Sequence, residues 1–179
     1  MRLALALLIA LTTACTTTTT VSGSAVTTTT SSGGGRARGA IELTLRRADG
    51  TFIEVGELRG RVVLLFVLAT FDTTSQMALT PLREIAEAYP DTAIVGVAAE
   101  PSARVLVEAY ESALEPPFPI TYDPNETVAE GESMLGEIEG VPTFIVLDRR
   151  GREVARHAGF ADEARLAELL AAAGATPRR

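Results

Sequence analysis

The sequence predicts an α/β domain with a central mixed sheet flanked by helices. Residues 62–68, 92–98 and 144–147 are apolar runs without charge, which is typical of strands covered on both faces. Between the first two runs, and after the last, apolar residues recur at helical spacing. This alternation predicts parallel strands joined by helical crossovers in the first half of the domain.

The first 14 residues predict a signal peptide. Arg2 supplies a positive charge, and the apolar run that follows is too short to cross a bilayer. The segment Leu-Thr-Thr-Ala-Cys at residues 11–15 resembles a bacterial lipobox, and this resemblance implies that Cys15 is acylated after cleavage. The alternative is an ordinary secretory signal, cleaved after Ala25, in which Cys15 is incidental.

A low-complexity segment follows Cys15. Residues 16–35 carry no charge and are mainly Thr, Ser, Gly, Val and Ala, so they cannot bury enough apolar surface to offset their ordering entropy. We therefore expect residues 15–39 to form a flexible, lipid-anchored tether. The expected location is the bacterial cell envelope, facing the periplasm or the exterior, and Thr16 after the cysteine favours the outer membrane.

The folded domain is expected at residues 40–175, and it begins with a hairpin. Residues 41–45 alternate apolar and polar side chains, as a half-buried strand does. The turn signal Asp49-Gly50 follows, and residues 51–55 can return as the second strand. After the buried strand at residues 62–68, Asp72 or Thr73 can cap a helix.

The rest of the domain predicts further strands and helices in alternation. The strands are expected at residues 92–98, 120–122, 144–147 and 153–157. The helices are expected at residues 101–114, 126–135 and 161–173. No internal repeat is evident.

Two segments carry a likeness to a known family. Residues 58–71, Leu-Arg-Gly-Arg-Val-Val-Leu-Leu-Phe and then Ala-Thr-Phe, and residues 140–148, Gly-Val-Pro-Thr-Phe-Ile-Val-Leu-Asp, resemble the TlpA/ResA-like thioredoxin family. These bacterial envelope proteins are related to the redoxin and AhpC/TSA group. The resemblance covers about residues 40–173. It implies a thioredoxin-like fold, thiol–disulfide chemistry and a cis peptide bond before Pro142.

The active-site phrase of that family is changed here. In the family an aromatic residue precedes Cys-x-x-Cys, whereas here Phe71 precedes Asp72 and Ser75 at the two cysteine positions. The acidic residue that follows in the family corresponds to Ala78. Cys15 is the single cysteine of the chain. Dithiol exchange needs an attacking thiolate and a resolving thiol, and peroxide reduction needs a cysteine as well.

Other chemistries find little support in the residues. We interpret Asp72 as a helix cap, and Ser75 would need an activating base to act as a nucleophile. The one histidine, His157, is expected on the last strand, away from that helix. No ligand spacing indicates a metal, and no cofactor is predicted. The net charge of −7 without a basic stripe argues against nucleic acid.

A binding function is therefore the main hypothesis. The family's proline loop is retained, and in that family the residue before the proline offers backbone hydrogen bonds to an extended peptide. We expect a groove formed by Phe71, Asp72, Val141, Pro142 and Thr143, which binds an extended segment of an envelope protein. The alternatives are an oxidoreductase or antioxidant protein of the TlpA/AhpC-TSA type, and a structural accessory domain whose groove is vestigial.

Overall fold

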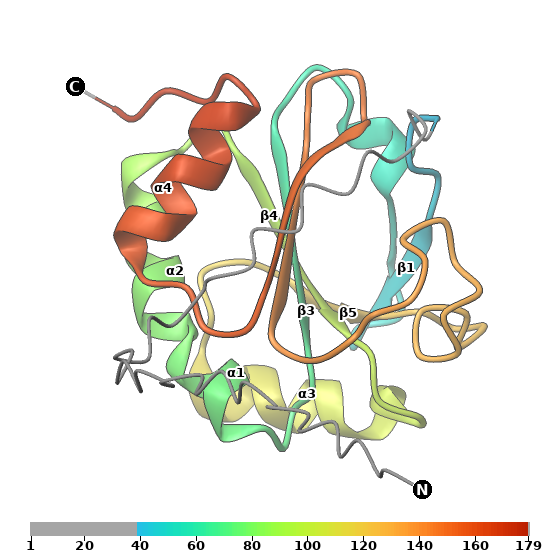
Figure 1. Cartoon of the computed structure of the whole chain (residues 1–179). Helices are drawn as coiled ribbons and strands as arrows, with labels where there is room; N and C mark the ends of the chain where they lie inside the picture. Colours follow the sequence, from blue (N-terminus) through green and yellow to red (C-terminus); the bar gives the residue numbers. More distant parts are fainter. Residues whose placement is uncertain (1–38, 179) are drawn as a thin grey trace, which may run out of the picture. The chain divides into compact units, whose positions relative to one another are not determined.

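The computed structural model describes residues 39–178. The predicted signal peptide, Cys15 and the predicted tether up to residue 38 lie outside these residues. Within them, seven strands form one mixed sheet in the order β2-β1-β5-β4-β3-β6-β7 (Figure 1). The predicted α/β architecture and the predicted N-terminal hairpin are therefore confirmed. None of the helices in the described range has the length and apolar character needed to cross a bilayer.

The centre of the sheet consists of the apolar runs seen in the sequence. β3 (Val63–Leu68) and β4 (Ala93–Ala98) are parallel, and every residue in both is buried. β5 (Ile120–Tyr122) continues the parallel pairing beyond β4. β6 (Thr143–Leu147) lies antiparallel on the other side of β3. These segments form strands because both of their faces are covered, which suits continuous runs of branched and aromatic side chains.

At both edges of the sheet the strands pair antiparallel with their neighbours. β7 (Glu153–Ala158) pairs with β6 at one edge. At the other edge, β1 (Thr44–Arg47) pairs with both β5 and β2 (Phe52–Glu54). β1 begins later than the sequence predicts, because Thr44 is its first residue with a ladder partner, which is Glu54 of β2. Gly50 has a φ of 87°, a backbone conformation that glycine adopts without strain.

The helices pack on one face of the sheet. They are α1 (Thr73–Met77), α2 (Leu79–Ala88), α3 (Ala103–Leu114) and α4 (Glu163–Ala172). The crossovers from β3 to β4 and from β4 to β5 step in the same direction across the sheet, so right-handed connections place α2 and α3 on the same face. α2 and α4 lie against each other on that face (Figure 1). Phe66 of β3 is fully buried in the cluster that they form.

The other face of the sheet is covered mainly without helices. Val63, Leu65 and Val67 of β3 pack there against Val55 of a short 3₁₀ helix, η1 (Val55–Leu58). The loop between β5 and β6 completes this cover with apolar side chains such as those of Val128 and Leu135.

The helix predicted at residues 126–135 is wrong, because this segment forms a series of turns. The carboxylate of Asp123 accepts a hydrogen bond from the backbone N–H of Val128, which fixes the first turn. Glu126 and Gly131 have φ values of 58° and 74°, and such left-handed residues interrupt a right-handed helix. Local side-chain bonds from Asp compete with the helical ladder in this way.

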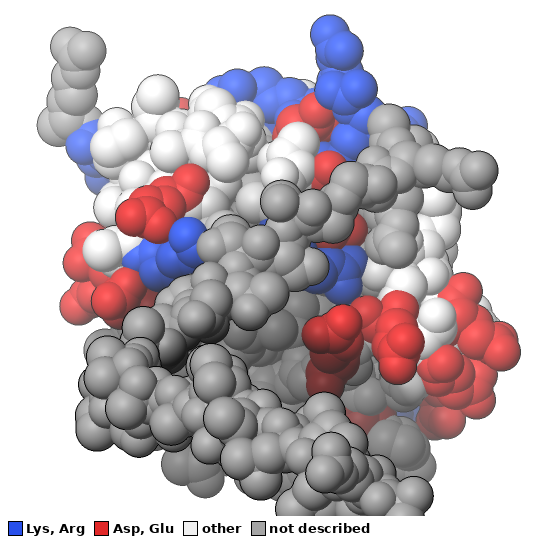
Figure 2. Space-filling view, viewed as in Figure 1, with Lys and Arg blue, Asp and Glu red and all other residues white. Residues whose placement is uncertain are grey.

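Charge is unevenly distributed on the surface that Figure 2 shows. Acidic side chains gather over the region of the β5–β6 loop, where Glu130, Glu132, Glu137 and Glu139 are exposed. Arginines lie mainly at the opposite end of this face, and the described part of it carries no continuous basic stripe.

Candidate functional site

The candidate site lies where three strands end at one edge of the sheet. Val67 of β3 pairs with Thr143 of β6, and Leu68 of β3 pairs with Ala98 of β4. Because β6 is antiparallel to β3 and β4 is parallel to it, the carboxyl ends of β3 and β4 meet the amino end of β6. The segments after β3, after β4 and before β6 are thus brought together. They contain Asp72, Glu100 and Pro142 respectively.

Asp72 caps helix α1, as the sequence predicts. Its Oδ2 accepts a hydrogen bond of 2.6 Å from the backbone N–H of Ser75, and its own backbone is extended. The side-chain amide of Gln76 donates to the carbonyl of Thr70 at 2.9 Å, which ties the turn together. The Asp72 carboxylate is favoured by the helix dipole as well as by the N–H of Ser75.

Replacing Asp72 by Ala is expected to lower the free energy of unfolding by about 1 kcal/mol, whereas Asp72→Asn costs only a few tenths because Asn caps almost as well. Urea denaturation monitored by circular dichroism measures both values. Asp162 is the matched control, since its Oδ1 caps α4 through the N–H of Arg165 at 2.8 Å. Asp162→Ala should cost a similar amount, and a cost near zero for Asp72→Ala would contradict the capping role.

Ser75 is fully buried, and its hydroxyl has no hydrogen-bond partner among residues 39–178. His157 lies on β7, where it pairs with Phe144 and its Nε2 is 3.1 Å from the carbonyl oxygen of Phe160. The structure therefore does not bring these two side chains together as a nucleophile and its base. Ala78, where the resemblance would place the family's acidic residue, is buried between α1 and α2.

Glu100 is a site residue that the sequence reasoning missed. It follows β4 and is only 8% exposed, although it carries a carboxyl group. Its Oε1 accepts hydrogen bonds from the backbone N–H of Thr70 at 3.1 Å and from the Thr70 hydroxyl at 2.5 Å. The sequence did contain one sign of this site, since Glu100 is an acidic residue directly after an apolar strand.

Tyr110 of α3 lies close to the same carboxyl group. Its side chain is buried, and its hydroxyl has no hydrogen-bond partner in the described part of the chain. Burial raises the pKa of the Tyr110 phenol to about 12, and the negative charges of Glu100 and Asp72 add to the effect. The phenol is therefore held in its neutral form, in which it can donate a hydrogen bond.

Unsatisfied polar atoms are concentrated in this cluster. Four buried side-chain atoms lack a hydrogen-bond partner within residues 39–178, and three of them are Ser75 Oγ, Glu100 Oε2 and Tyr110 Oη; the fourth is Arg47 Nε. Buried polar atoms in folded proteins are nearly always hydrogen-bonded, to protein or to ordered water. The buried base of the site thus holds two hydroxyl groups and one carboxylate oxygen that have no hydrogen-bond partner among these residues. No cluster of potential metal ligands occurs in the same residues.

The proline loop forms the other wall of the site. The Val141–Pro142 peptide bond is cis, and the carbonyl of Pro142 accepts a 2.7 Å hydrogen bond from the N–H of Gly159. The hydroxyl of Thr143 donates to the carbonyl of Gly140 at 2.6 Å, so that side chain is buried and faces away from solvent. Within residues 39–178, neither the N–H nor the C=O of Val141 forms a hydrogen bond.

Phe71 differs from the buried residues of the site because its side chain lies in solvent. Its side chain is 73% exposed, directly before the capping Asp72. A large aromatic side chain in water contributes little to the stability of the domain but offers apolar area to a partner. The predicted groove residues therefore differ in kind: Phe71 and Val141 are accessible, whereas Pro142 and Thr143 are buried supports.

No family model and no curated protein matches the sequence. Among solved structures, the chain is similar to a putative thiol:disulfide interchange protein DsbE from Chlorobium tepidum, with 21% identity, 78% of this chain and 99% of that chain covered, and a TM-score of 0.63. A thio-disulfide isomerase from Thermus thermophilus gives 23% identity, 78% and 96% coverage and a TM-score of 0.63. The pneumococcal exposed lipoprotein thioredoxin from Streptococcus pneumoniae gives 20% identity, 73% and 98% coverage and a TM-score of 0.61. At these identities the likeness shows the fold, and the predicted thioredoxin-like fold with an added N-terminal hairpin is confirmed.

Proposed function

We propose that the chain is an envelope-tethered, thioredoxin-like lipoprotein that binds an extended segment of another envelope protein and does not carry out dithiol chemistry. The observation that carries this proposal is the backbone of Val141, which forms no hydrogen bond within residues 39–178, at the same end of the sheet as the segment with the exposed ring of Phe71. One free backbone N–H and one free C=O in the loop before β6 can pair with the backbone of an extended peptide. Such binding requires shape and backbone donors, and it requires no thiol.

An apolar rim supports this form of binding. Besides Phe71, the large apolar side chains of Met77 on α1 and of Phe160 after β7 are exposed. Phe160 is held near the proline loop, because the N–H of the preceding Gly159 bonds to the carbonyl of Pro142. Exposed apolar side chains gathered around a backbone edge are typical of peptide-binding surfaces, where they contact alternate side chains of the added strand.

The absence of cysteine from residues 39–178 supports the second half of the proposal. Several structural neighbours are named as thiol:disulfide interchange proteins, disulfide oxidoreductases or isomerases, and the proposed correspondence places Asp72 and Ser75 at the two cysteine positions of that family. A carboxylate can cap the helix that the first cysteine would begin, yet it cannot form a mixed disulfide. Oxidoreductase activity in this chain would need thiols from a partner.

The proposed anchor is Cys15, with residues 15–39 as the tether. The lipobox-like segment before Cys15 and the uncharged segment after it support this arrangement. One structural neighbour is itself an exposed lipoprotein. The domain would then face the periplasm or the exterior, with the outer membrane as the proposed anchoring membrane. A single acyl chain gives only marginal membrane binding, so stable attachment requires more than one chain on the anchor.

Photocrosslinking in intact envelopes tests the binding proposal. A photoreactive residue in place of Val141 or Asp72 is expected to give a discrete crosslinked partner. Val154 is a matched control, since it is also a valine and its side chain is exposed. The β6–β7 register places it near Leu147, at the opposite end of β6 from Val141. Crosslinking at positions 72 and 141 that is no stronger than at position 154 would contradict binding and favour a vestigial groove.

A further inference from the structure

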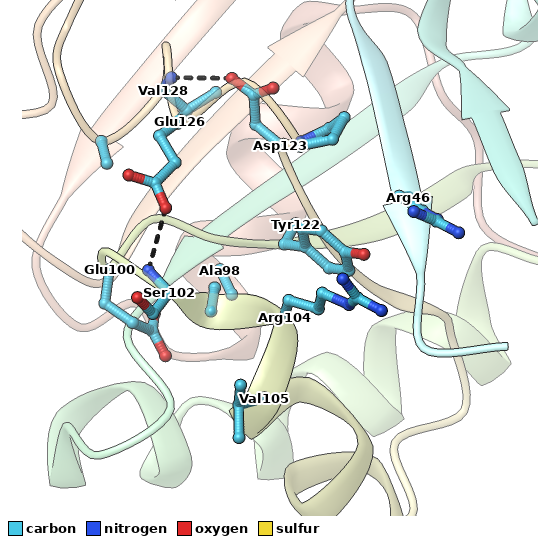
Figure 3. A pocket seen from close by; sticks show the side chains of 13 residues that line it. Arg46, Ala98, Glu100, Ser102, Arg104, Val105, Tyr122, Asp123, Glu126 and Val128 are labelled. Carbon is cyan, nitrogen blue, oxygen red and sulfur yellow. Dashed lines mark hydrogen bonds between the residues drawn. The ribbon is translucent and has the colours of Figure 1, made fainter. Parts of the chain in front are cut away.

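A cavity lies beside the end of β4, separate from the proposed peptide groove. It has a volume of about 320 Å³ and is bounded by the hairpin strand β1, by β5 and by the start of α3 (Figure 3). It shares Glu100 with the buried polar cluster, but Phe71, Asp72 and Val141 do not line it. Cavities of this size hold small molecules.

One side of the cavity is acidic. Glu100 is more than nine-tenths buried and lines it, and its Oε2 has no hydrogen-bond partner within the described range. Glu126 lies on the same side in Figure 3, where its Oε1 accepts a hydrogen bond from the N–H of Ser102 at 3.2 Å. Asp123 also lines the cavity, but both of its oxygens already bond to the β5–β6 loop. A buried carboxylate oxygen without a partner favours a charged hydrogen-bond donor.

The other side of the cavity is basic. Arg46, Arg104 and the hydroxyl end of Tyr122 lie together there, apart from the two glutamates (Figure 3). Arg46 is held in place by the carbonyl of Gly50 at 3.4 Å and by the ring of Phe52 at 5.4 Å. No ion pair involves either of the two arginines among residues 39–178. Two guanidinium groups that line one cavity without an acidic partner favour a carboxylate.

Ala98 lies between these two sides in Figure 3, and Val105 and Val128 also line the cavity with side chains that cannot hydrogen-bond. Ser102 and Glu126, which join the acidic side, both have left-handed backbones, with φ values of 61° and 58°. Such strained residues cluster at functional sites.

We propose that this cavity binds a small zwitterion, with an ammonium group at Glu100 and a carboxylate at Arg104 and Arg46, joined by a short alkyl chain. Amino acids and short peptides belong to this chemical class. The ammonium group would supply the donor that Glu100 Oε2 lacks, and the alkyl chain would contact Val105 and Val128. This inference does not rest on the peptide groove, because Phe71, Asp72 and Val141 do not line the cavity, although Glu100 also belongs to the buried polar cluster of the candidate site.

Calorimetric titration of the full chain with 6-aminohexanoate tests the proposal. This probe carries both charges at the ends of an apolar chain, and it is expected to bind saturably. Hexylamine and hexanoate, which each carry one of the two charges, are expected to bind at least tenfold more weakly, a difference of about 1.4 kcal/mol per factor of ten. The proposal is overturned if 6-aminohexanoate shows no saturable binding at about 10 mM, or if either single-charge probe binds equally well.

Two variants test which side chains bind the ammonium and carboxylate groups of the probe. Glu100→Gln and Arg104→Gln are each expected to weaken 6-aminohexanoate binding at least tenfold, about 1.4 kcal/mol. Glu108→Gln is the matched control, because Glu108 is exposed on the same helix and does not line the cavity, and binding should be unchanged. Unchanged binding in Glu100→Gln overturns the proposal. If that variant fails to fold, Arg104→Gln and the probe comparison on the unmodified chain still decide the question.

Discussion

Replacing Asp72 and Ser75 together by cysteine is expected to give the chain an insulin-reducing activity, whereas the unmodified chain is expected to show none. Residues three apart at the start of a helix fall within the Cα separation of about 4.4–6.8 Å that a disulfide requires. The N-terminus of α1 would lower the pKa of the first thiol, and the loop at Pro142 already stands at the same edge of the sheet. The expected change is from the rate of the protein-free blank to a clear turnover.

The assay is best made in a Cys15→Ser background, which removes the only native thiol. Each single cysteine variant should remain inactive, since one thiol cannot both attack and resolve. Thr73→Cys with Gln76→Cys is the matched control, with the same spacing on exposed positions of the same helix. Turnover by the unmodified chain would refute the proposal that the domain lacks thiol chemistry, and an inert Asp72/Ser75 double variant would argue against the inferred geometry of the site.

The fold was predictable because its central strands are buried on both faces. Residues 62–68 and 92–98 could hardly form anything but inner strands, since continuous apolar runs of that length need cover on both sides. The Asp49-Gly50 turn likewise predicted the hairpin, because its glycine is needed at a positive φ. In these segments the local pattern and the tertiary environment agree.

The β5–β6 loop was not predictable in the same way. Its apolar residues, Val128 and Leu135, do face the sheet, so the expectation of burial was correct while the predicted helix was wrong. The loop forms turns instead of a helix because the carboxylate of Asp123 accepts hydrogen bonds from several of its backbone and side-chain groups. Spacing of apolar residues carries no information on such a side-chain bond.

The candidate site was predictable only in part. The location of Asp72 at the start of a helix was predictable, because the flanking residues resemble the family's active-site segment and because Asp is a good helix cap. Glu100 and Tyr110 could not, because their proximity to Thr70 and Asp72 depends on the β3–β4 register and on how α3 packs. These residues are distant in sequence, and a single sequence contains no direct signal of their contact.

Replacing Phe66 by Ala is expected to lower the free energy of unfolding by about 3–5 kcal/mol. Phe66 is fully buried at the centre of β3, where its ring stacks on Phe144 at 5.4 Å and meets the edge of Phe118 at 6.4 Å. The loss includes both the apolar transfer energy and the cavity left behind. Since domains of this size are stable by only about 5–15 kcal/mol, urea denaturation should show a large shift of the midpoint.

Phe71→Ala removes the same side chain from a surface position, and it separates folding from binding. Because Phe71 is 73% exposed, this change should alter the free energy of unfolding by no more than about 0.5 kcal/mol. It should nevertheless reduce crosslinking from position 141, since the ring would contact the bound segment. A loss of stability comparable to that of Phe66→Ala would instead make Phe71 part of the fold, and the groove would then lose its accessible aromatic wall.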